Sequence, residues 1–164
     1  MPIDVHLMTN NPDQFLNVFA RVGVTRVIPH IEATGHPHRL IMQIMELGME
    51  AGIAMNPATR IDSIEYLLPE IDVVTLMAIN PGIIGHKFIP SMMDKISNMR
   101  TWLDSKKYEG QLEVDGGVVF ENITGLANSG ADILVGGAGS VFHGAATVQE
   151  NISRIKLLTQ EINQ

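Results

Sequence analysis

The 164-residue sequence contains no cysteine, which excludes disulfides and thiolate chemistry. Aromatic residues make up only 5% of the chain, whereas methionine occurs 10 times, a composition typical of a flexible, polarizable core. Basic residues are outnumbered 18 to 11 by acidic ones, and the net charge of −7 argues against nucleic acid or anionic membrane surfaces as partners.

Long apolar runs are also missing, so the sequence predicts no membrane-spanning segment. Pro2 and Asp4 stand where the apolar core of a signal peptide would begin. Together with the absence of cysteine, these features lead us to expect a cytoplasmic protein. With 45% hydrophobic and 18% charged residues, the chain is long enough for one folded domain with a substantial core.

Short apolar segments alternate with segments of helical pattern along the whole chain, which predicts parallel strands joined by helical crossovers. The expected strands cover residues 3–8, 24–29, 53–55, 73–79, 112–115 and 133–135. The expected helices begin near Asn11, which we expect to cap the first of them, and cover residues 11–23, 37–51, 61–68, 91–106, 121–129 and 147–160.

Two architectures fit this order: an open doubly wound sheet, or part of a (β/α)8 barrel. Six units in 164 residues average roughly 27 residues, so eight would need about 219, near the lower limit for such barrels. Every expected strand ends in polar or glycine-rich residues. Barrel chemistry is spread over many strand ends, whereas an open sheet concentrates it at one switch point, and this observation favours the barrel.

The strand ends carry the residues that could form a site: His6, His30 with Glu32, Asn56, the 80–86 loop, Asp115 and the 136–140 turn. Imidazole and carboxylate groups that converge can bind a divalent metal. Glycine-rich turns can hold a phosphate through main-chain N–H groups, so an acidic protein could still bind an anionic substrate.

Each of these features also has an ordinary structural interpretation. Asp115 followed by Gly116 and Gly117 could form a simple turn, and the 136–140 segment a close-packed one. A single histidine at a strand end is more often a hydrogen-bonded structural residue than a ligand. Methionines at positions 8, 55 and 77 are more often core residues than site lining. The conjunction of several strand ends is what favours a site.

At this point the residues show a resemblance to a known family. The matching segments are 4–8 (DVHLM), 30–33 (HIEA), 55–59 (MNPAT), 77–88 (MAINPGIIGHKF), 114–117 (VDGG) and 130–142. In this order and spacing the chain resembles the ribulose-phosphate 3-epimerase family, which includes the allulose-6-phosphate 3-epimerases. The resemblance implies a (β/α)8 TIM barrel of the ribulose-phosphate-binding type, present here as six βα units, strands 3 to 8 of the family. It also implies inversion at C3 of a ketose phosphate with a bound divalent metal (Zn, Fe, Mn or Co).

The resemblance assigns roles to individual residues. His6 matches a metal-binding histidine, and Asp115 matches an aspartate that binds the metal and acts as one of two acid/base groups. Met8 and Met77 match methionines that line the family's site, and we expect His30 and His86 nearby. The backbone that matches the phosphate site comprises Gly85, Gly116, Gly117, Gly137, Ala138, Gly139 and Ser140, with the 136–140 turn expected at a helix start.

The sequence departs from the family pattern in three respects. His86 stands where the family usually has glutamine. The 136–140 turn is longer by about one residue than in the common ribulose version and looks more like the allulose branch. The segment His-x-Asp-x-Met-Asp-Gly, which in the family supplies two further metal ligands and the second catalytic aspartate, has no match here.

Two hypotheses about function follow. The chain belongs to a ketose-phosphate 3-epimerase but has little activity by itself, because only Asp115 of the two acid/base groups is present. Alternatively, it is a non-catalytic remnant that binds sugar phosphate or acts by assembly. A doubly wound phosphate-binding protein is a third interpretation. In all cases we expect a small sugar phosphate as ligand and, because six strands leave open edges, a homo-oligomer.

Overall fold

The computed structural model of the chain describes residues 1–82 and 87–160. One parallel sheet runs through it, and each strand pairs with the next strand in the sequence. Its strands are β1 (Asp4–Leu7), β2 (Arg26–Pro29), β3 (Glu50–Met55), β4 (Val73–Met77), β5 (Gln111–Asp115) and β6 (Ile133–Val135). This consecutive order has no switch point, so it confirms the barrel type and excludes the doubly wound alternative.

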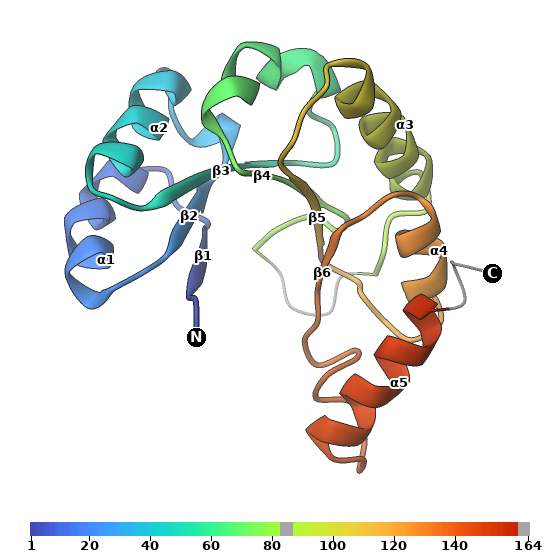
Figure 1. Ribbon diagram of the computed structural model, residues 1–164. Coiled ribbons are helices and arrows are strands. Elements are labelled where there is room, and N and C mark those ends of the chain that lie inside the picture. The colour runs from blue at the N-terminus through green and yellow to red at the C-terminus, as the bar shows by residue number, and fades with distance from the viewer. Residues whose placement is uncertain (83–86, 161–164) are drawn as a thin grey trace.

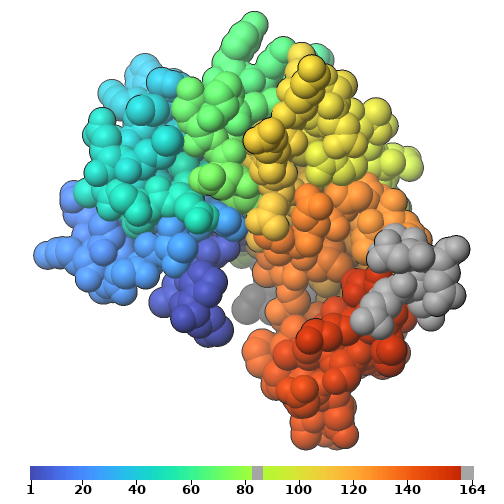
Figure 2. Space-filling view, in the orientation of Figure 1, coloured from blue at the N-terminus to red at the C-terminus, as the bar shows by residue number. Residues whose placement is uncertain are grey.

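The sheet curls into a partial barrel with the helices on its outer side (Figure 1). The helices are α1 (Leu16–Val22), α2 (Pro37–Glu46), α3 (Met92–Ser105), α4 (Ile123–Asn128) and α5 (Val148–Gln160), and the 3-10 segments are η1 (Pro12–Phe15), η2 (Ile31–Ala33) and η3 (Ile61–Glu70). In the described ranges, none of these helices combines the length and the apolar character that a bilayer crossing requires. Figure 2 shows a gap on one side of the molecule, between its first residues and its C-terminal part.

Alternation along the strands divides the core into two layers. Val74 and Leu76 of β4 face the helices, where they join a large apolar cluster that includes Ile44 of α2 and Ile96 of α3. The inner face of the sheet carries a much smaller cluster of Ile28, Ala54 and Val73. The helix-covered side therefore provides most of the apolar burial, and the inner face is available for polar residues.

Two expectations from the sequence were wrong in detail. The helix expected over residues 37–51 ends at Glu46, because Gly48 adopts the left-handed conformation with a φ of 80° and β3 already begins at Glu50. The first helix is divided into η1 and α1, and Asn11 makes no side-chain capping bond. Its end at Gly23 is confirmed, with a φ of 79° and an N–H that donates to the carbonyl of Ala20.

Ion pairs close the amino-terminal end of the inner face. Arg26 of β2 donates to Asp4 of β1 at 3.1 Å and to Glu50 of β3 at 2.6 Å. Asp4 therefore lies away from the carboxyl ends of the strands, as its position at the start of β1 predicts.

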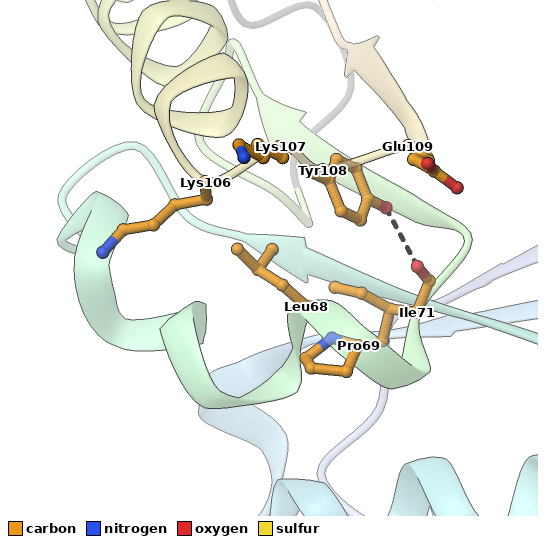
Figure 3. Close-up of a pocket in the computed structure, with 8 residues that line it drawn as sticks. Leu68, Pro69, Ile71, Lys106, Lys107, Tyr108 and Glu109 are labelled. Carbon is orange, nitrogen blue, oxygen red and sulfur yellow. Dashed lines mark hydrogen bonds between the residues drawn. The ribbon is translucent and has the colours of Figure 1, made fainter.

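A pocket of about 350 Å³ also lies at this end, where β4 and β5 begin (Figure 3). Tyr108 reaches across it, and its hydroxyl donates to the carbonyl of Ile71 at 3.1 Å. Burial, followed by the negative charge of Asp72, raises the pKa of Tyr108 above its ordinary value. Barrel chemistry occurs at the opposite ends of the strands, so we assign this pocket a structural role.

Tyr108 should make the stability of the chain sensitive to alkaline pH. The pKa of its phenol in the folded state exceeds the unfolded value of about 10, so the unfolded state binds fewer protons above pH ~10 and the free energy of unfolding falls there. We expect Tyr108→Phe to reduce this alkaline loss and Tyr66→Phe, at a residue that is 87% exposed, to leave it unchanged. Denaturant unfolding between pH 8 and 11 checks this, and equal behaviour of the two variants would contradict it.

Candidate functional site

His6 and Asp115 meet at the carboxyl ends of strands that are not neighbours. His6 lies in β1 and Asp115 ends β5, and three strands separate them in the sheet. The curl of the sheet nevertheless places Nδ1 of His6 only 2.7 Å from Oδ2 of Asp115. Their side chains are 14% and 20% exposed, so the pair is largely shielded from water but remains accessible from the mouth.

His30, at the end of β2, extends this pair. Its Nε2 lies 2.9 Å from Nε2 of His6, and the two rings are nearly parallel, at 16°, and meet edge to edge with centroids 5.0 Å apart. On its other side, Nδ1 of His30 lies 3.2 Å from Oε2 of Glu32. The four side chains thus form one continuous row from Glu32 through His30 and His6 to Asp115.

Glu32 is held through both of its carboxylate oxygens. While Oε2 faces His30, Oε1 accepts a hydrogen bond from the backbone N–H of Asn56 at 2.9 Å and another from the hydroxyl of Thr59. Both donors belong to the segment that follows β3. The carboxylate therefore connects the end of β2 to the next strand end of the barrel.

Lys95 of α3 fixes that same segment from the outside. Its ammonium donates to the carbonyls of Asn56, Pro57 and Thr59 at 3.0, 2.9 and 2.7 Å. Burial lowers the pKa of Lys95 below its ordinary value, although the charge of Glu32 acts in the opposite direction. A half-buried cation with three carbonyl partners is a strong local constraint on a loop.

The pKa values of His30 and Glu32 are both lowered, but for different reasons. Burial, followed by the neighbouring His6, lowers the pKa of His30 and outweighs the opposing effect of Glu32. Partial burial acts to raise the pKa of Glu32, but the hydrogen bonds from Thr59 and Asn56 prevail and hold it below its ordinary value. Glu32 is therefore an ionised acceptor at neutral pH, and its neighbour His30 favours the neutral imidazole.

A cleft of about 410 Å³ opens beside the row. It is lined by Met8, Thr9, Asn10, His30, Glu32, Ala33, Asn56 and Pro81. Met8 and His30, both predicted for the site, thus line this cleft. Met77 is different: it is only 1% exposed, pairs in register with Asp115 and is not among the residues that line the cleft.

The two glycine turns lie next to each other beyond Asp115. Gly116 and Gly117 have φ values of 102° and 65°, which side chains rarely adopt. Gly139 packs against the residues that follow them: a Cβ there would lie 2.8 Å from Cγ1 of Val119 and 3.3 Å from the carbonyl oxygen of Val118. The structure therefore brings these predicted phosphate-binding turns together.

The 136–140 turn differs from the sequence prediction in one respect. It does not open a helix, because α5 begins only at Val148. The N–H groups of Ser140 and Phe142 both donate to the carbonyl of Gly137, at 3.1 Å each. Any phosphate held here would therefore use the N–H groups of residues 137–139 rather than a helix terminus. Gly85 and His86, also predicted for the site, lie outside the described residues.

The donor chemistry of His6 and Asp115 fits a divalent ion in part. One imidazole nitrogen and one carboxylate oxygen face each other, and both are ordinary ligands of zinc and related metals. In the part of the chain that the structure describes, no group of three or more histidine or acidic side chains is arranged to hold an ion. The pair therefore provides part of a ligand set.

Sequence reasoning missed several residues that shape the site. Glu32 was noted at a strand end, but nothing in the sequence indicated that Thr59 and Lys95 would hold its surroundings. Glu113 is a second surprise: it is 5% exposed on the inner face, accepts a hydrogen bond from Thr75 at 2.8 Å, and burial raises its pKa. Alternation with Asp115 was the available signal, because residues two apart in a strand share a face.

Removal of the Lys95 ammonium should loosen the segment after β3. We expect Lys95→Met to lower the free energy of unfolding by about 1–3 kcal/mol, because carbonyls are left without their donor. Amide exchange at Thr59 and its neighbours should also become faster. Lys156→Met, at an exposed lysine of α5, is the matched control and should change neither quantity. Equal stability of the two variants would contradict the assigned constraint.

Comparisons with known proteins agree with this geometry. The model of the ribulose-phosphate 3 epimerase family matches residues 1–142. The chain is 40% identical over 157 residues to the ribulose-phosphate 3-epimerase of Bacillus subtilis (strain 168), which covers 95% of this chain and 71% of that protein. It is 41% identical over 137 residues to the enzyme of the same name from Escherichia coli (strain K12), which covers 84% of this chain and 61% of that protein.

A solved structure supports the fold independently of sequence. The 3-hexulose-6-phosphate synthase from Salmonella typhimurium superposes with a TM-score of 0.66 at 16% identity, over 98% of this chain and 74% of that one. The chain spans about 61–71% of the length of the two curated relatives. The family match, the identity to these relatives and the barrel geometry lead to one conclusion: the chain belongs to the ribulose-phosphate 3-epimerase family.

Proposed function

We propose that the mouth of this barrel serves 3-epimerisation of a ketose phosphate. The substrate pair is ribulose 5-phosphate and xylulose 5-phosphate, or allulose 6-phosphate and fructose 6-phosphate. The observation that carries the proposal is the contact of 2.7 Å between His6 and Asp115 at the carboxyl ends of β1 and β5. The family to which the chain belongs supports this reaction class.

Asp115 is the proposed acid/base group. Its Oδ2 faces His6, so that Oδ1 would take the proton from C3 or return it. A divalent ion (Zn, Fe, Mn or Co), held in part by His6 and Asp115, would supply positive charge beside the oxygens of the substrate and so acidify C3. The shielded position of the pair strengthens such electrostatic effects, because little water competes.

The phosphate is proposed to bind at the two adjacent glycine turns. Gly116 and Gly117 follow Asp115 directly, and the 136–140 turn lies against the residues after them. Backbone donors suit an anion in a protein of net charge −7, because they need no general positive field. The proposed set also includes Ser140, with Met8 and His30 beside the sugar. Gly85 and His86 stay in the proposal although they lie outside the described residues, and Met77 would act only from its buried position beneath the mouth.

Inversion requires a donor and an acceptor on opposite faces of C3, and among the described residues we assign only Asp115 to such a role. Glu32, the acidic residue that lines the cleft, is engaged by His30, Asn56 and Thr59. Asp4 is paired with Arg26 at the far end of the strand. We therefore propose that the 164-residue chain has little epimerase activity by itself.

A second function is favoured by the edges of the sheet. In the described residues, β1 pairs only with β2 and β6 only with β5, so each has one unpaired edge. Exposed edges promote association with other chains. Binding of sugar phosphate without turnover, or assembly into a homo-oligomer, is therefore the alternative. Light scattering of the purified chain measures the assembly.

A chimera tests the epimerase proposal. In it, the two family βα units that carry the His-x-Asp segment are placed ahead of Met1. We expect ketose-phosphate turnover from the chimera, and turnover lower by at least ~10²-fold for its Asp115→Asn variant and for the 164-residue chain alone, because one acid/base group is then missing. Proton exchange at C3 of both candidate substrates is the measurement. An equally active Asp115→Asn chimera would disprove the assigned role, and ordinary turnover by the chain alone would disprove the proposed inactivity.

Gly137 offers a test of the phosphate position. A Cβ at this glycine would meet no atom within 4 Å, so the fold should tolerate a larger side chain. We expect Gly137→Leu to weaken binding of a ketose phosphate at least tenfold, because the side chain blocks access to the turn. Calorimetric titration measures this, with unchanged thermal unfolding as the control. Unchanged affinity would place the phosphate elsewhere.

A further inference from the structure

The row Glu32–His30–His6–Asp115 includes two side chains, Glu32 and His30, that are not proposed as metal ligands. Its three contacts measure 3.2, 2.9 and 2.7 Å. Two neutral imidazoles carry one N–H each, so they supply two protons to three contacts. One contact must therefore lack a proton, and its position decides what His6 can bind.

A cation between His6 and Asp115 leaves a single consistent arrangement. The ion uses the lone pair of Nδ1 of His6, so the proton of His6 lies on Nε2 and donates to Nε2 of His30. His30 then carries its proton on Nδ1 and donates it to Glu32. Ionised Glu32 is a suitable terminus, because a carboxylate only accepts hydrogen bonds.

We infer that Glu32 is a positioning residue that acts through His30 to keep Nδ1 of His6 free for a cation. This inference rests on the proposed function, since it takes His6 as a ligand of the divalent ion. Outer partners of metal-binding histidines commonly fix the tautomer and the ring orientation in this way. Here the carboxylate of Glu32 does not contact the metal-binding imidazole directly, but acts on His6 through the second imidazole of His30.

The contacts of Glu32 make the inference unusually easy to test. Oε1 already accepts hydrogen bonds from the N–H of Asn56 and from the hydroxyl of Thr59. In Glu32→Gln these two donors fix the amide oxygen at the same place, so the amide NH₂ must point at His30. His30 would then accept at Nδ1 and carry its proton on Nε2, where it opposes the N–H of His6. The isosteric variant thus reverses the donor order of the row.

Alanine at the same position has a different effect. Glu32→Ala removes the acceptor but introduces no donor, and the side chain of Glu32 is 33% exposed, so water can accept from Nδ1 of His30. His30 can therefore keep its proton on Nδ1, and His6 can keep its proton on Nε2. A positioning role therefore predicts that glutamine is worse than alanine for cation binding, whereas a merely structural role predicts the reverse.

The first measurement is the affinity of the 164-residue chain for Zn²⁺ and Co²⁺, by calorimetry and by the cobalt absorption spectrum. We expect Glu32→Gln to weaken binding by about 10–100-fold and Glu32→Ala to weaken it less, while thermal unfolding is lowered more by alanine. His6→Asn should abolish binding. Glu46→Gln, an equal charge change at an exposed residue of α2, should leave the affinity unchanged. An affinity of Glu32→Gln equal to that of the wild type, or above that of Glu32→Ala, would overturn the inference.

The second measurement is independent of the metal. Nitrogen-15 spectra of the imidazoles should show His30 protonated at Nδ1 in the wild-type chain and at Nε2 in Glu32→Gln. A wild-type His30 protonated only at Nε2 would overturn the inference even if the variant fails to fold. A switch of His30 without any binding of ions would support control by Glu32 and would disprove the proposed metal site, so the two ideas can fail separately.

Discussion

The curvature of the parallel sheet is the constraint on which the candidate site depends. β1 and β5 are separated by three strands, yet His6 and Asp115 are 2.7 Å apart. In a flat sheet of the same order the two strands would lie four spacings apart, at roughly 4.8 Å each. The helices maintain the curve, because the large apolar cluster lies on their side of the sheet and only a small one lies inside.

The polar row at the mouth uses the space that this arrangement leaves. His30 lines the cleft and contacts His6, while Glu32 connects the row to the segment after β3 and Lys95 holds that segment from α3. The imidazoles at the mouth and the segment after β3 are thereby coupled through hydrogen bonds. The shifts in the pKa values of His30 and Glu32 follow the same logic, since burial disfavours charge on the imidazole and donors stabilise it on the carboxylate.

The sequence was sufficient to predict the strands, the barrel type and the meeting of His6 with Asp115. Alternation and strand ends are local signals, and the resemblance to the family supplied the roles. It was not sufficient for the end of α2: the helical pattern continues to residue 51, whereas the helix ends at Glu46, just before Gly48 turns the chain into β3. Nor could it predict Lys95, whose carbonyl partners lie 36 to 39 positions away in the chain.

The consecutive strand order also has a consequence for folding. Each strand can pair as soon as its immediate successor in the chain is made, so most of the sheet can form from contacts of modest sequence separation. The contact of His6 with Asp115 spans 109 positions and cannot form until the intervening units are in place. A break in the chain anywhere between these residues could leave individual units intact and still destroy the mouth. The contact of the His6 ring with Asp115 therefore reports that all the intervening units have folded, and not that any one of them has.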